Sequence, residues 1–446
     1  MINKIFGFCD KYNTIPEIIE PVKRIVAIGD VHGDFDYLIH LLKIALVIDN
    51  EYHWIGGSTH VVQLGDQIDS CRPYYNNCQD ESATQNDKAE DIKIINFLGE
   101  LHNDAVKKNG AVISLLGNHE IMNIAGDMNY VSKKNLDDVG GIEKRRKLFA
   151  KDGEIGKKLI CTHPSVIIIG SNLFVHAGIL PQLTENIPKI RETYKNAIIE
   201  YIKSMKDKDV VNLLINYVIH KNIKKEILIS IDKKDKDFWD TTFDNDNKIK
   251  HIADLIKKNS TILRNLLENA DKIKDYFVNN SDILNIDNIH DVEIINDVVR
   301  LWLFDKINDT EVMDSIKSLF WNRILGNLPN DKHKNQEPIT CKSFVDPILH
   351  FFNINHMIIG HTPQYIANQS GINYSCDATV AKVDIGGSNA FDAFDSEYVK
   401  TGKKMKNRTP QVLVIDDDKN FRVLYYETPT ITGGKFLNFF KNFYFI

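Results

Sequence analysis

Short apolar segments alternate with longer segments of helical spacing over the first 120 residues. The segments "RIVAIGD" (24–30), "HVVQLGD" (60–66) and "AVISLLGNHE" (111–120) each contain a run of apolar residues, which predicts short interior strands. Between them, "FDYLIHLLKIALVI" (35–48) and "DIKIINFLGELHNDAVKKNG" (91–110) carry apolar residues at the spacing of amphipathic helices. Strands that alternate with helices in this way predict a parallel sheet.

Further apolar segments in the second half of the chain follow one another closely, with no helical pattern between most of them. We therefore expect a second sheet, mixed or antiparallel, packed on the first. The predicted fold class is α/β, with two packed mixed sheets flanked by helices. The segments expected to build the second sheet are 164–179, 356–364, 378–387, 411–417 and 420–427.

Changes in composition divide the chain into a main domain and three other segments. Residues 1–22 form an N-terminal segment, and residues 23–428 form the main domain. Within it, residues 182–318 are rich in Lys, Ile, Asn and Asp and have helical spacing, which predicts a helical insertion. It forms either a cap over a site or a helical layer that completes the fold. We expect the aromatic tail, 429–446, to pack on the body as a strand or short helix, with membrane-surface docking as the alternative.

The overall composition excludes several classes of protein. A net charge of −6 over 446 residues gives no support for binding a nucleic-acid backbone. No apolar run is long enough to span a membrane, and charges appear too early for a secretory signal. The cysteines show no CxxC pair, which predicts free thiols and a cytoplasmic location, although Cys71 and Cys78 are close enough in sequence to meet. The six are Cys9, Cys71, Cys78, Cys161, Cys341 and Cys376.

Five of the predicted strands end in polar side chains suited to holding metal ions. Carboxylate, imidazole and amide oxygen together are typical of manganese, iron or zinc, whereas magnesium and calcium prefer oxygen alone. The sequence therefore predicts a centre for two cations, with Asp66 as the carboxylate that bridges them. Asp30 and His32 complete the first ion, and the second takes Asn118, His176 and His361.

The order of these motifs resembles the calcineurin-like metallophosphoesterases, in their phosphoprotein phosphatase branch. The chain carries GDxHG, GDxxD, GNHE, a histidine in HAG and a histidine in GHT, in that order. The stretches "GNHEIMNIAGDMNYV", "GHTPQ" and "VDIGGSNAF" are similar to the Shewanella-like phosphatases within that branch. The resemblance covers residues 24–181 and about 318–426, and the helical insertion carries no matching motif.

The resemblance implies hydrolysis of a phosphoester by a hydroxide that bridges two metal ions. His119 would protonate the leaving oxygen, and Asp69 would orient its imidazole. Asp34, just after the first motif, is expected to be structural. The implied cofactors are two divalent or transition metal ions, with manganese expected first and iron or zinc as alternatives. The implied substrate is a phosphoprotein, phosphorylated on Ser or Thr, or on Tyr; the oligomeric state stays open.

One motif departs from the family pattern. The family continues the second motif as GDxxDRG, whereas this chain reads "GDQIDSCRP", with Ser70 at the arginine position and Cys71 at the glycine position. Arg72 and Arg323 are the candidates for holding the phosphate in its place, and we favour Arg323. Asn118 is a third candidate for contacting the phosphate.

Two other functions remain open at this point. The first is a nucleotide hydrolase of the diadenosine tetraphosphatase or cap-cleaving kind, which shares the metal ligands. The second is a catalytically dead scaffold that binds phosphorylated partners. A scaffold is expected to have lost metal ligands, and all of them are present in this chain.

Overall fold

The chain folds into two compact units, seen here in a computed structural model. One comprises Met1–Asp10 and Pro188–Asp297, and the other comprises Lys11–Ile187 and Val298–Ile446. The structure describes residues 7–73, 77–84, 87–219, 264, 266–279, 286–331, 340–395, 408–426 and 440–444. Much of the predicted insertion, including residues 220–263, therefore lies outside the described residues.

The larger unit contains two six-stranded sheets. In the first the strand order is β12-β11-β10-β2-β3-β4, and in the second it is β1-β5-β6-β7-β9-β8. Both are mixed, since β2, β3 and β4 run parallel while β10 is antiparallel to β2, and β6 and β7 run parallel while β5 is antiparallel to β6. The strands of the first sheet are β2 (Arg24–Ile28), β3 (His60–Gln63), β4 (Ala111–Ser114), β10 (Gln411–Asp416), β11 (Asn420–Tyr426) and β12 (Phe440–Tyr444). Those of the second are β1 (Ile18–Ile19), β5 (Val166–Ile169), β6 (Asn172–Val175), β7 (His356–Ile359), β8 (Asn373–Ser375) and β9 (Val380–Lys382).

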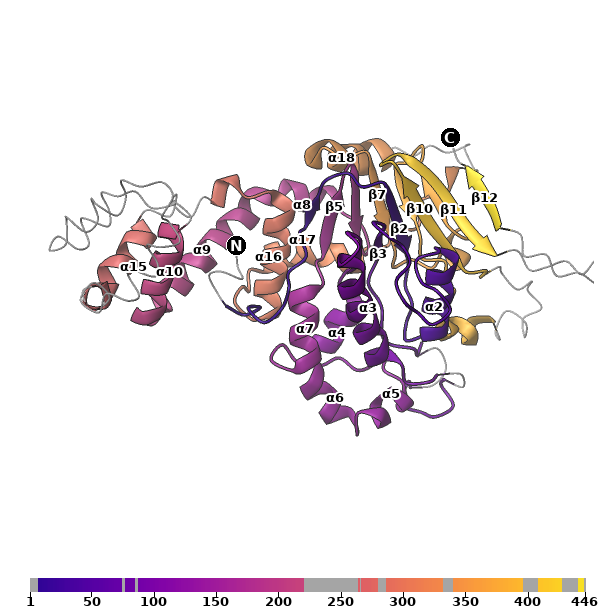
Figure 1. The fold of residues 1–446 in the computed structure, drawn as a ribbon, viewed down its shortest axis with the longest axis horizontal. Helices are drawn as coiled ribbons and strands as arrows, with labels where there is room; N and C mark the ends of the chain where they lie inside the picture. The colour runs from indigo at the N-terminus through magenta and orange to yellow at the C-terminus, as the bar shows by residue number, and fades with distance from the viewer. Residues whose placement is uncertain are drawn as a thin grey trace, which may run out of the picture. The chain divides into compact units, whose positions relative to one another are not determined.

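The last strands of the chain belong to the first sheet, which the sequence did not predict. Strand β10 pairs antiparallel with β2, so that Leu413 lies opposite Ala27. In Figure 1, yellow β10, β11 and β12 therefore lie beside indigo β2. Pairing between strands almost 400 residues apart leaves no local signal, so the expected place of 411–417 and 420–427 in the second sheet is wrong. Strand β12, from the aromatic tail, extends this sheet by pairing with β11.

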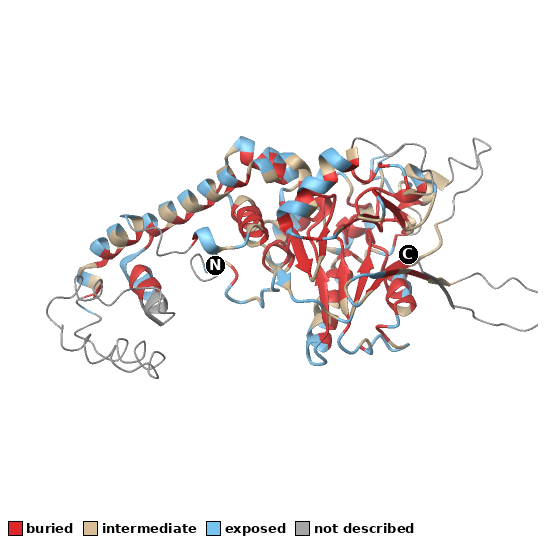
Figure 2. Cartoon of the chain, turned by 90° about the horizontal axis from the view of Figure 1, so that it is seen from above, coloured by how far each residue is buried: buried red, intermediate tan, exposed pale blue. Residues whose placement is uncertain are grey.

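Alternation along the strands explains how the sheets pack. Successive side chains of a strand point to opposite faces, so Ile25 and Ala27 of β2 face one way and Val26 and Ile28 the other. Ile25 and Ala27 join a core between the sheets, together with Phe174 of β6. Val26 and Ile28 join a second core with helices α2 (Phe35–Ile44) and α3 (Asp91–Val106). Figure 2 shows most residues of the central strands of this unit as buried. The predicted α/β class with two packed mixed sheets is confirmed.

The remaining helices vary in length, from 3 residues in η4 to 18 in α9. The larger unit contains α4 (Asn118–Ile124), α5 (Lys133–Asp138), α6 (Ile142–Phe149), α7 (Glu154–Thr162), α8 (Pro181–Glu185), α17 (Thr310–Trp321), the π-helical turn η6 (Cys341–Val345), α18 (Asp346–Phe352), α19 (Gln364–Ala367) and η7 (Asn389–Phe391). The other described helices are α9 (Ile187–Ser204), α10 (Asp207–Ile219), α15 (Ala270–Asn279), η4 (Ile286–Asn288) and α16 (Asp291–Leu303). In the smaller unit, α9 and α16 are joined by an ion pair between Arg191 and Asp291, 2.6 Å apart. None of the helices described in the structure is both long and apolar enough to cross a membrane.

Candidate active site

The polar side chains that follow the strands converge on Asp66. The Nε2 atoms of His32 and His119 lie 3.8 Å from its Oδ2 atom, and that of His176 lies 3.3 Å away. Parallel strands end at the same edge of a sheet, and this edge is where open α/β sheets bind ligands. The structure therefore brings the predicted bridging carboxylate to the centre of the cluster.

The other predicted ligands complete two overlapping groups around Asp66. One group contains Asp66, His32 and His119, and the other contains Asp66, His176 and His361, with the ligand atoms of each group within 4.8 Å of one another. Asn118 joins the second group, since its Oδ1 atom lies 3.0 Å from Nε2 of His176. Asp30 lies 3.8 Å from His32 and accepts the backbone N–H of His361. All six predicted ligands are thus together, and His119 lies with them.

Backbone carbonyls fix which ring nitrogen of two histidines faces the cluster. His176 donates its Nδ1–H to the carbonyl oxygen of Leu64 at 2.6 Å, and His32 donates to that of Ile68 at 3.2 Å. This leaves each Nε2 atom, directed at Asp66, as the nitrogen available to a metal ion. A second hydrogen bond of this kind is the usual way in which proteins orient a metal-binding imidazole.

The backbone at four of these residues is in the left-handed region. The φ angles are +44° at His32, +53° at Asp66, +70° at Asp69 and +63° at His361. Left-handed backbone is uncommon outside glycine and costs of order 1 kcal/mol or more for each residue. Such strain gathers at functional sites, where the surrounding structure holds side chains in directions that relaxed strands do not offer.

Gly117 of the GNHE motif is required by close packing rather than by an unusual turn. Its φ of −105° is open to any residue, whereas a Cβ atom here would lie 2.2 Å from Oδ1 of Asp66. Glu120 holds the GNHE loop against the segment that carries Asp66. Its carboxylate accepts the backbone N–H groups of Gly117, Asp66 and Gln67 at 2.8–2.9 Å. Gly117 therefore makes room for Asp66.

Electrostatics favour a cation in this cluster. Burial, followed by repulsion from Asp384 and Asp66, raises the pKa of Asp30 well above its usual range. Burial also opposes ionisation of Asp66, but His176, His119 and His32 outweigh it and lower its pKa well below the usual range. Burial raises the pKa of Asp384 to about 6. Three carboxylates buried together repel one another, and a bound cation relieves that repulsion.

His361 gives the clearest sign that the cluster suits metal ions. It is buried, yet neither ring nitrogen has a hydrogen-bond partner among the described residues. Burial lowers the pKa of His361 well below its usual range, so that its imidazole is neutral, as metal ligation requires. A buried polar group without a partner is unfavourable. The two groups around Asp66, of mixed nitrogen and oxygen donors, therefore fit two transition-metal ions.

The predicted dyad of His119 and Asp69 is joined by a hydrogen bond. Nδ1–H of His119 donates to Oδ2 of Asp69 at 2.8 Å, which leaves Nε2 directed at the metal cluster. The Asp69 carboxylate also accepts from Asn123 at 3.0 Å and from Arg145 at 3.5 Å. Arg145 donates to Asp91 at 2.7 Å, and this network fixes the position of the dyad from behind.

Both candidate arginines lie beside the cluster. Arg72 donates to the backbone oxygen atoms of Asp69 and Cys71 at 3.1 and 2.8 Å. Its guanidinium lies 4.8 Å from the ring centre of Phe391, and its charge interacts with the site carboxylates. Arg323 is exposed and donates to the backbone oxygen of His361 at 3.0 Å. Which of the two arginines holds the phosphate stays a prediction.

The cysteines are paired, which overturns the prediction of free thiols. Cys71 forms a disulfide with Cys78, and Cys341 forms one with Cys376; no cysteine among the described residues is free. The pairings depend on how the chain returns on itself, with Cα atoms 5.7 and 5.5 Å apart. Disulfides are rare in reducing compartments, so the pairing argues against the environment that the sequence suggested. The cytoplasmic location stays a prediction.

Sequence reasoning missed Asn123, Arg145 and Asp384. Asn123 lies one helical turn after His119, and this spacing was a usable signal. Asp384 follows strand β9 in "VDIGG", so the rule applied to the other strand ends also reaches it. Asp34 has the structural role expected of it, because it caps α2 by accepting the backbone N–H of Tyr37. Ser70 accepts a hydrogen bond from Asn135.

The two-sheet α/β fold and the histidine and aspartate cluster at its strand ends agree with a metal-dependent phosphatase. Residues 23–230 match the family model described as calcineurin-like phosphoesterase. The resemblance to this family that the motifs predicted is confirmed over this part of the chain.

The chain is also similar to several individual proteins. An uncharacterized protein of Acanthamoeba polyphaga mimivirus is 27% identical over 74% of this chain and 97% of its own length. Shewanella-like protein phosphatase 2 of Arabidopsis thaliana is 30% identical over 40% of this chain, and the chain spans 52% of that protein. A solved cold-active protein tyrosine phosphatase of a Shewanella species is 19% identical with a TM-score of 0.47, covering 92% of this chain and 80% of that one.

Proposed function

We propose that this chain is a two-metal protein phosphatase that hydrolyses phosphoesters of Ser and Thr, or of Tyr. The observation that carries the proposal is the hydrogen-bonded pair His119–Asp69, with its Nε2 atom 3.8 Å from the carboxylate at the centre of the metal cluster. A proton donor beside two metal ions is an arrangement that can catalyse phosphoester hydrolysis. Asp30, His32 and Asp66 would hold one ion, and Asp66, Asn118, His176 and His361 the other.

Each protein group has a distinct role in this proposal. When bound, the two ions, of manganese, iron or zinc, supply positive charge and an activated water molecule. His119 gives its Nε2 proton to the leaving oxygen, and Asp69 keeps Nδ1 protonated and the ring oriented. Arg72 and Asn118 donate hydrogen bonds to the phosphate oxygens, and Arg323 assists from the exposed side.

A nucleotide substrate is the second candidate. The arrangement of the aromatic side chains around the site disfavours it. A nucleotide base requires an open aromatic or arginine face on which to stack. Phe391 is buried and lies against His32 and Arg72, while Tyr130 lies against His119 and Arg72. Arg72 therefore lies over one face of each ring, and Phe391 is buried as a whole. A panel of phosphopeptides and dinucleoside polyphosphates tests the choice: faster hydrolysis of the dinucleotides overturns the protein substrate.

Replacing the bridging carboxylate is expected to weaken both metal sites. In Asp66→Asn one charged oxygen is lost from each ion's surroundings, so we expect metal content to fall from about two ions per chain towards zero, along with activity. Metal analysis after dialysis measures this. The matched control is Asp34→Asn, which retains a helix-capping side chain and is expected to keep both ions. Full metal content in Asp66→Asn would show that Asp66 does not bridge.

Replacing Arg72 is expected to impair phosphate binding more than replacing Arg323. Arg72→Lys keeps the charge but loses the planar fork that matches two phosphate oxygens, so we expect kcat/KM to fall by about 10- to 100-fold. For Arg323→Lys, at the exposed position, kcat/KM should fall less. Steady-state kinetics on one phosphopeptide, with inhibition by inorganic phosphate, compares them. A larger loss in Arg323→Lys would restore the ranking made from the sequence.

A further inference from the structure

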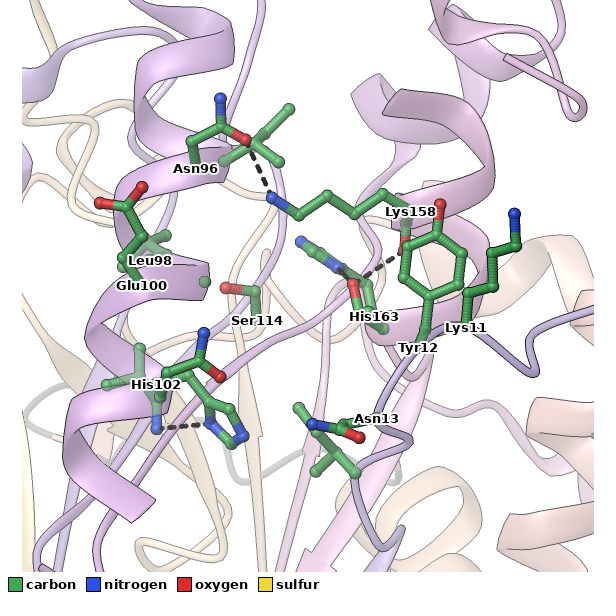
Figure 3. A pocket seen from close by; sticks show the side chains of 16 residues that line it. Lys11, Tyr12, Asn13, Asn96, Leu98, Glu100, His102, Ser114, Lys158 and His163 are labelled. Carbon is green, nitrogen blue, oxygen red and sulfur yellow. Dashed lines mark hydrogen bonds between the residues drawn. The ribbon is translucent and has the colours of Figure 1, made fainter. Parts of the chain in front are cut away.

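A cavity of about 260 Å³ lies in the larger unit, behind the strand that leads to the GNHE loop. It is lined by residues of the N-terminal segment, of α3, of β4 and of the end of α7. Figure 3 shows Lys158 and His163 on one side and the α3 residues Asn96 and Glu100 on the other. None of the proposed metal ligands lines it. Its volume lies just below the range of about 300–1,000 Å³ for drug-sized ligand pockets, which suits a small metabolite rather than a peptide.

His163 presents a buried hydrogen-bond acceptor to this cavity. The hydroxyl of Thr162 donates its single proton to the backbone oxygen of Lys158 at 2.8 Å. It can therefore only accept from His163, whose Nδ1 lies 2.8 Å away, so Nδ1 carries the proton and Nε2 has the lone pair. The residue is 6% exposed, and its Nε2 atom has no hydrogen-bond partner among the described residues. A ligand with a hydrogen-bond donor, such as a hydroxyl group, satisfies it.

Lys158 supplies a positive charge beside that acceptor. Its Nζ atom donates to Asn96 at 2.9 Å, and it forms no ion pair with any described residue. An ammonium group has three protons, so two remain for a ligand. Across the whole lining, Lys11 and Lys158 give two positive charges and Glu100 gives one negative charge. Burial lowers the pKa of His102, and it lowers the pKa of His163 to about 3, so both imidazoles are neutral. The net charge of one matches a monoanion.

Gly99 lines the same cavity from the middle of α3. Glycine destabilises a helix interior relative to alanine, so a packing reason is expected for it. A Cβ atom here would meet only Lys158, with Nζ 3.5 Å away, which is an ordinary contact distance. Packing against other residues therefore does not require glycine. The absence of a side chain at Gly99 leaves the space in front of Lys158 open.

We propose that this cavity binds a small hydroxylated monocarboxylate, separately from the metal centre. The carboxylate lies against Lys158, a hydroxyl group donates to Nε2 of His163, and the short carbon skeleton contacts Leu98 and Val112. Pro164, next to His163, accepts the backbone N–H of Leu116 at 3.0 Å, which connects the cavity wall to the loop before Asn118. This inference goes beyond the proposed phosphatase activity and does not depend on it.

Calorimetric titration of the full-length, metal-loaded protein with D-glycerate tests the proposal. Propionate lacks the hydroxyl groups and glycerol lacks the charge, so we expect each to bind at least about tenfold more weakly than glycerate. Lys158→Met should weaken glycerate binding by about tenfold or more. Lys157→Met is the matched control, since this neighbour on α7 does not line the cavity, and its affinity should equal that of the wild type.

A second variant keeps the test decisive if Lys158→Met folds poorly. Gly99→Leu fills the space in front of Lys158 with a good helix former, so we expect unchanged or higher thermal stability and loss of glycerate binding. No binding of glycerate to the wild type would overturn the proposal. Binding that both cavity variants retain, and that competes with the phosphatase substrate, would place glycerate at the metal centre and would also overturn it.

Discussion

His119→Asn is expected to lower kcat by about 10²- to 10⁴-fold while both metal ions stay bound. The reason is that Nδ1 of His119 is held by Asp69, and Nε2 is placed to give a proton to the leaving oxygen. The loss should be smaller for a nitrophenyl phosphate, because nitrophenolate leaves without much protonation. Kinetics with a phosphoserine peptide and a nitrophenyl phosphate, together with metal analysis, measure both effects.

The structure also allows a competing role for His119, as a metal ligand. Its Nε2 atom lies with His32 and Asp66 in a group that suits one metal ion, so His119 as a ligand is the alternative. A ligand and a proton donor differ in their response to replacement. If His119→Asn emptied a metal site and slowed good and poor leaving groups equally, the histidine would be a ligand. Asp69→Asn separates the two further, because it should reduce kcat while keeping both ions.

The strand-end residues of the site were predictable because their signal is local. Asp30, Asp66 and Asn118 each follow an apolar run, and such a run shows in the sequence itself. A strand also ends where its polar residues begin, so one pattern indicates both the element and the candidate ligand. The left-handed backbone at His32 and Asp66 had no such signal, since it depends on the loops that pack against them.

Features that depend on distant parts of the chain were not predictable in the same way. The pairing of β10 with β2 and the disulfide between Cys341 and Cys376 each require the chain to return on itself. Arg145 lies in "EKRRKLF", where it is indistinguishable by residue type from exposed Arg146. Helical spacing was the usable signal, because Arg145 precedes buried Phe149 by four positions and so shares its face.

Arg145 contributes both to the stability of the fold and to the position of the His119–Asp69 dyad. Its side chain is completely buried, and Nη2 donates to Asp91 at 2.7 Å and to Asp69 at 3.5 Å. Nε donates to Asn123 at 2.9 Å, and Asn123 in turn donates to Asp69. Burial raises the pKa of Asp91 to about 7 despite the opposing charge of Arg145. Removing the arginine would leave two buried carboxylates without their cation.

Arg145→Met is expected to lower the free energy of unfolding by about 3–5 kcal/mol, the usual cost of breaking a buried ion pair from one side. Arg146→Met is the matched control on the same helix, because its ion pair with Glu143 is exposed, and we expect a change within about 0.5 kcal/mol. Denaturant unfolding of both variants measures the difference. Equal stabilities would show that the network around Asp91 contributes nothing.

The dependence on pH distinguishes loss of this charge from loss of packing. In the wild type, folded Asp91 keeps a proton up to about pH 7, whereas the unfolded chain releases it near pH 4. The contribution of Asp91 to the free energy of unfolding therefore falls as the pH rises from about 4 to about 7, both in the wild type and in Arg145→Met. Without Arg145 the pKa of folded Asp91 rises further, so only the variant continues to lose stability above pH 7. The difference in free energy of unfolding between the wild type and Arg145→Met should be larger at pH 8.5 than at pH 6. Adding Asp91→Asn to Arg145→Met should reduce this difference. If the difference in free energy of unfolding did not depend on pH, the lost stability would come from packing of Arg145 against Phe149. The ring centre of Phe149 lies 4.4 Å from the guanidinium carbon of Arg145.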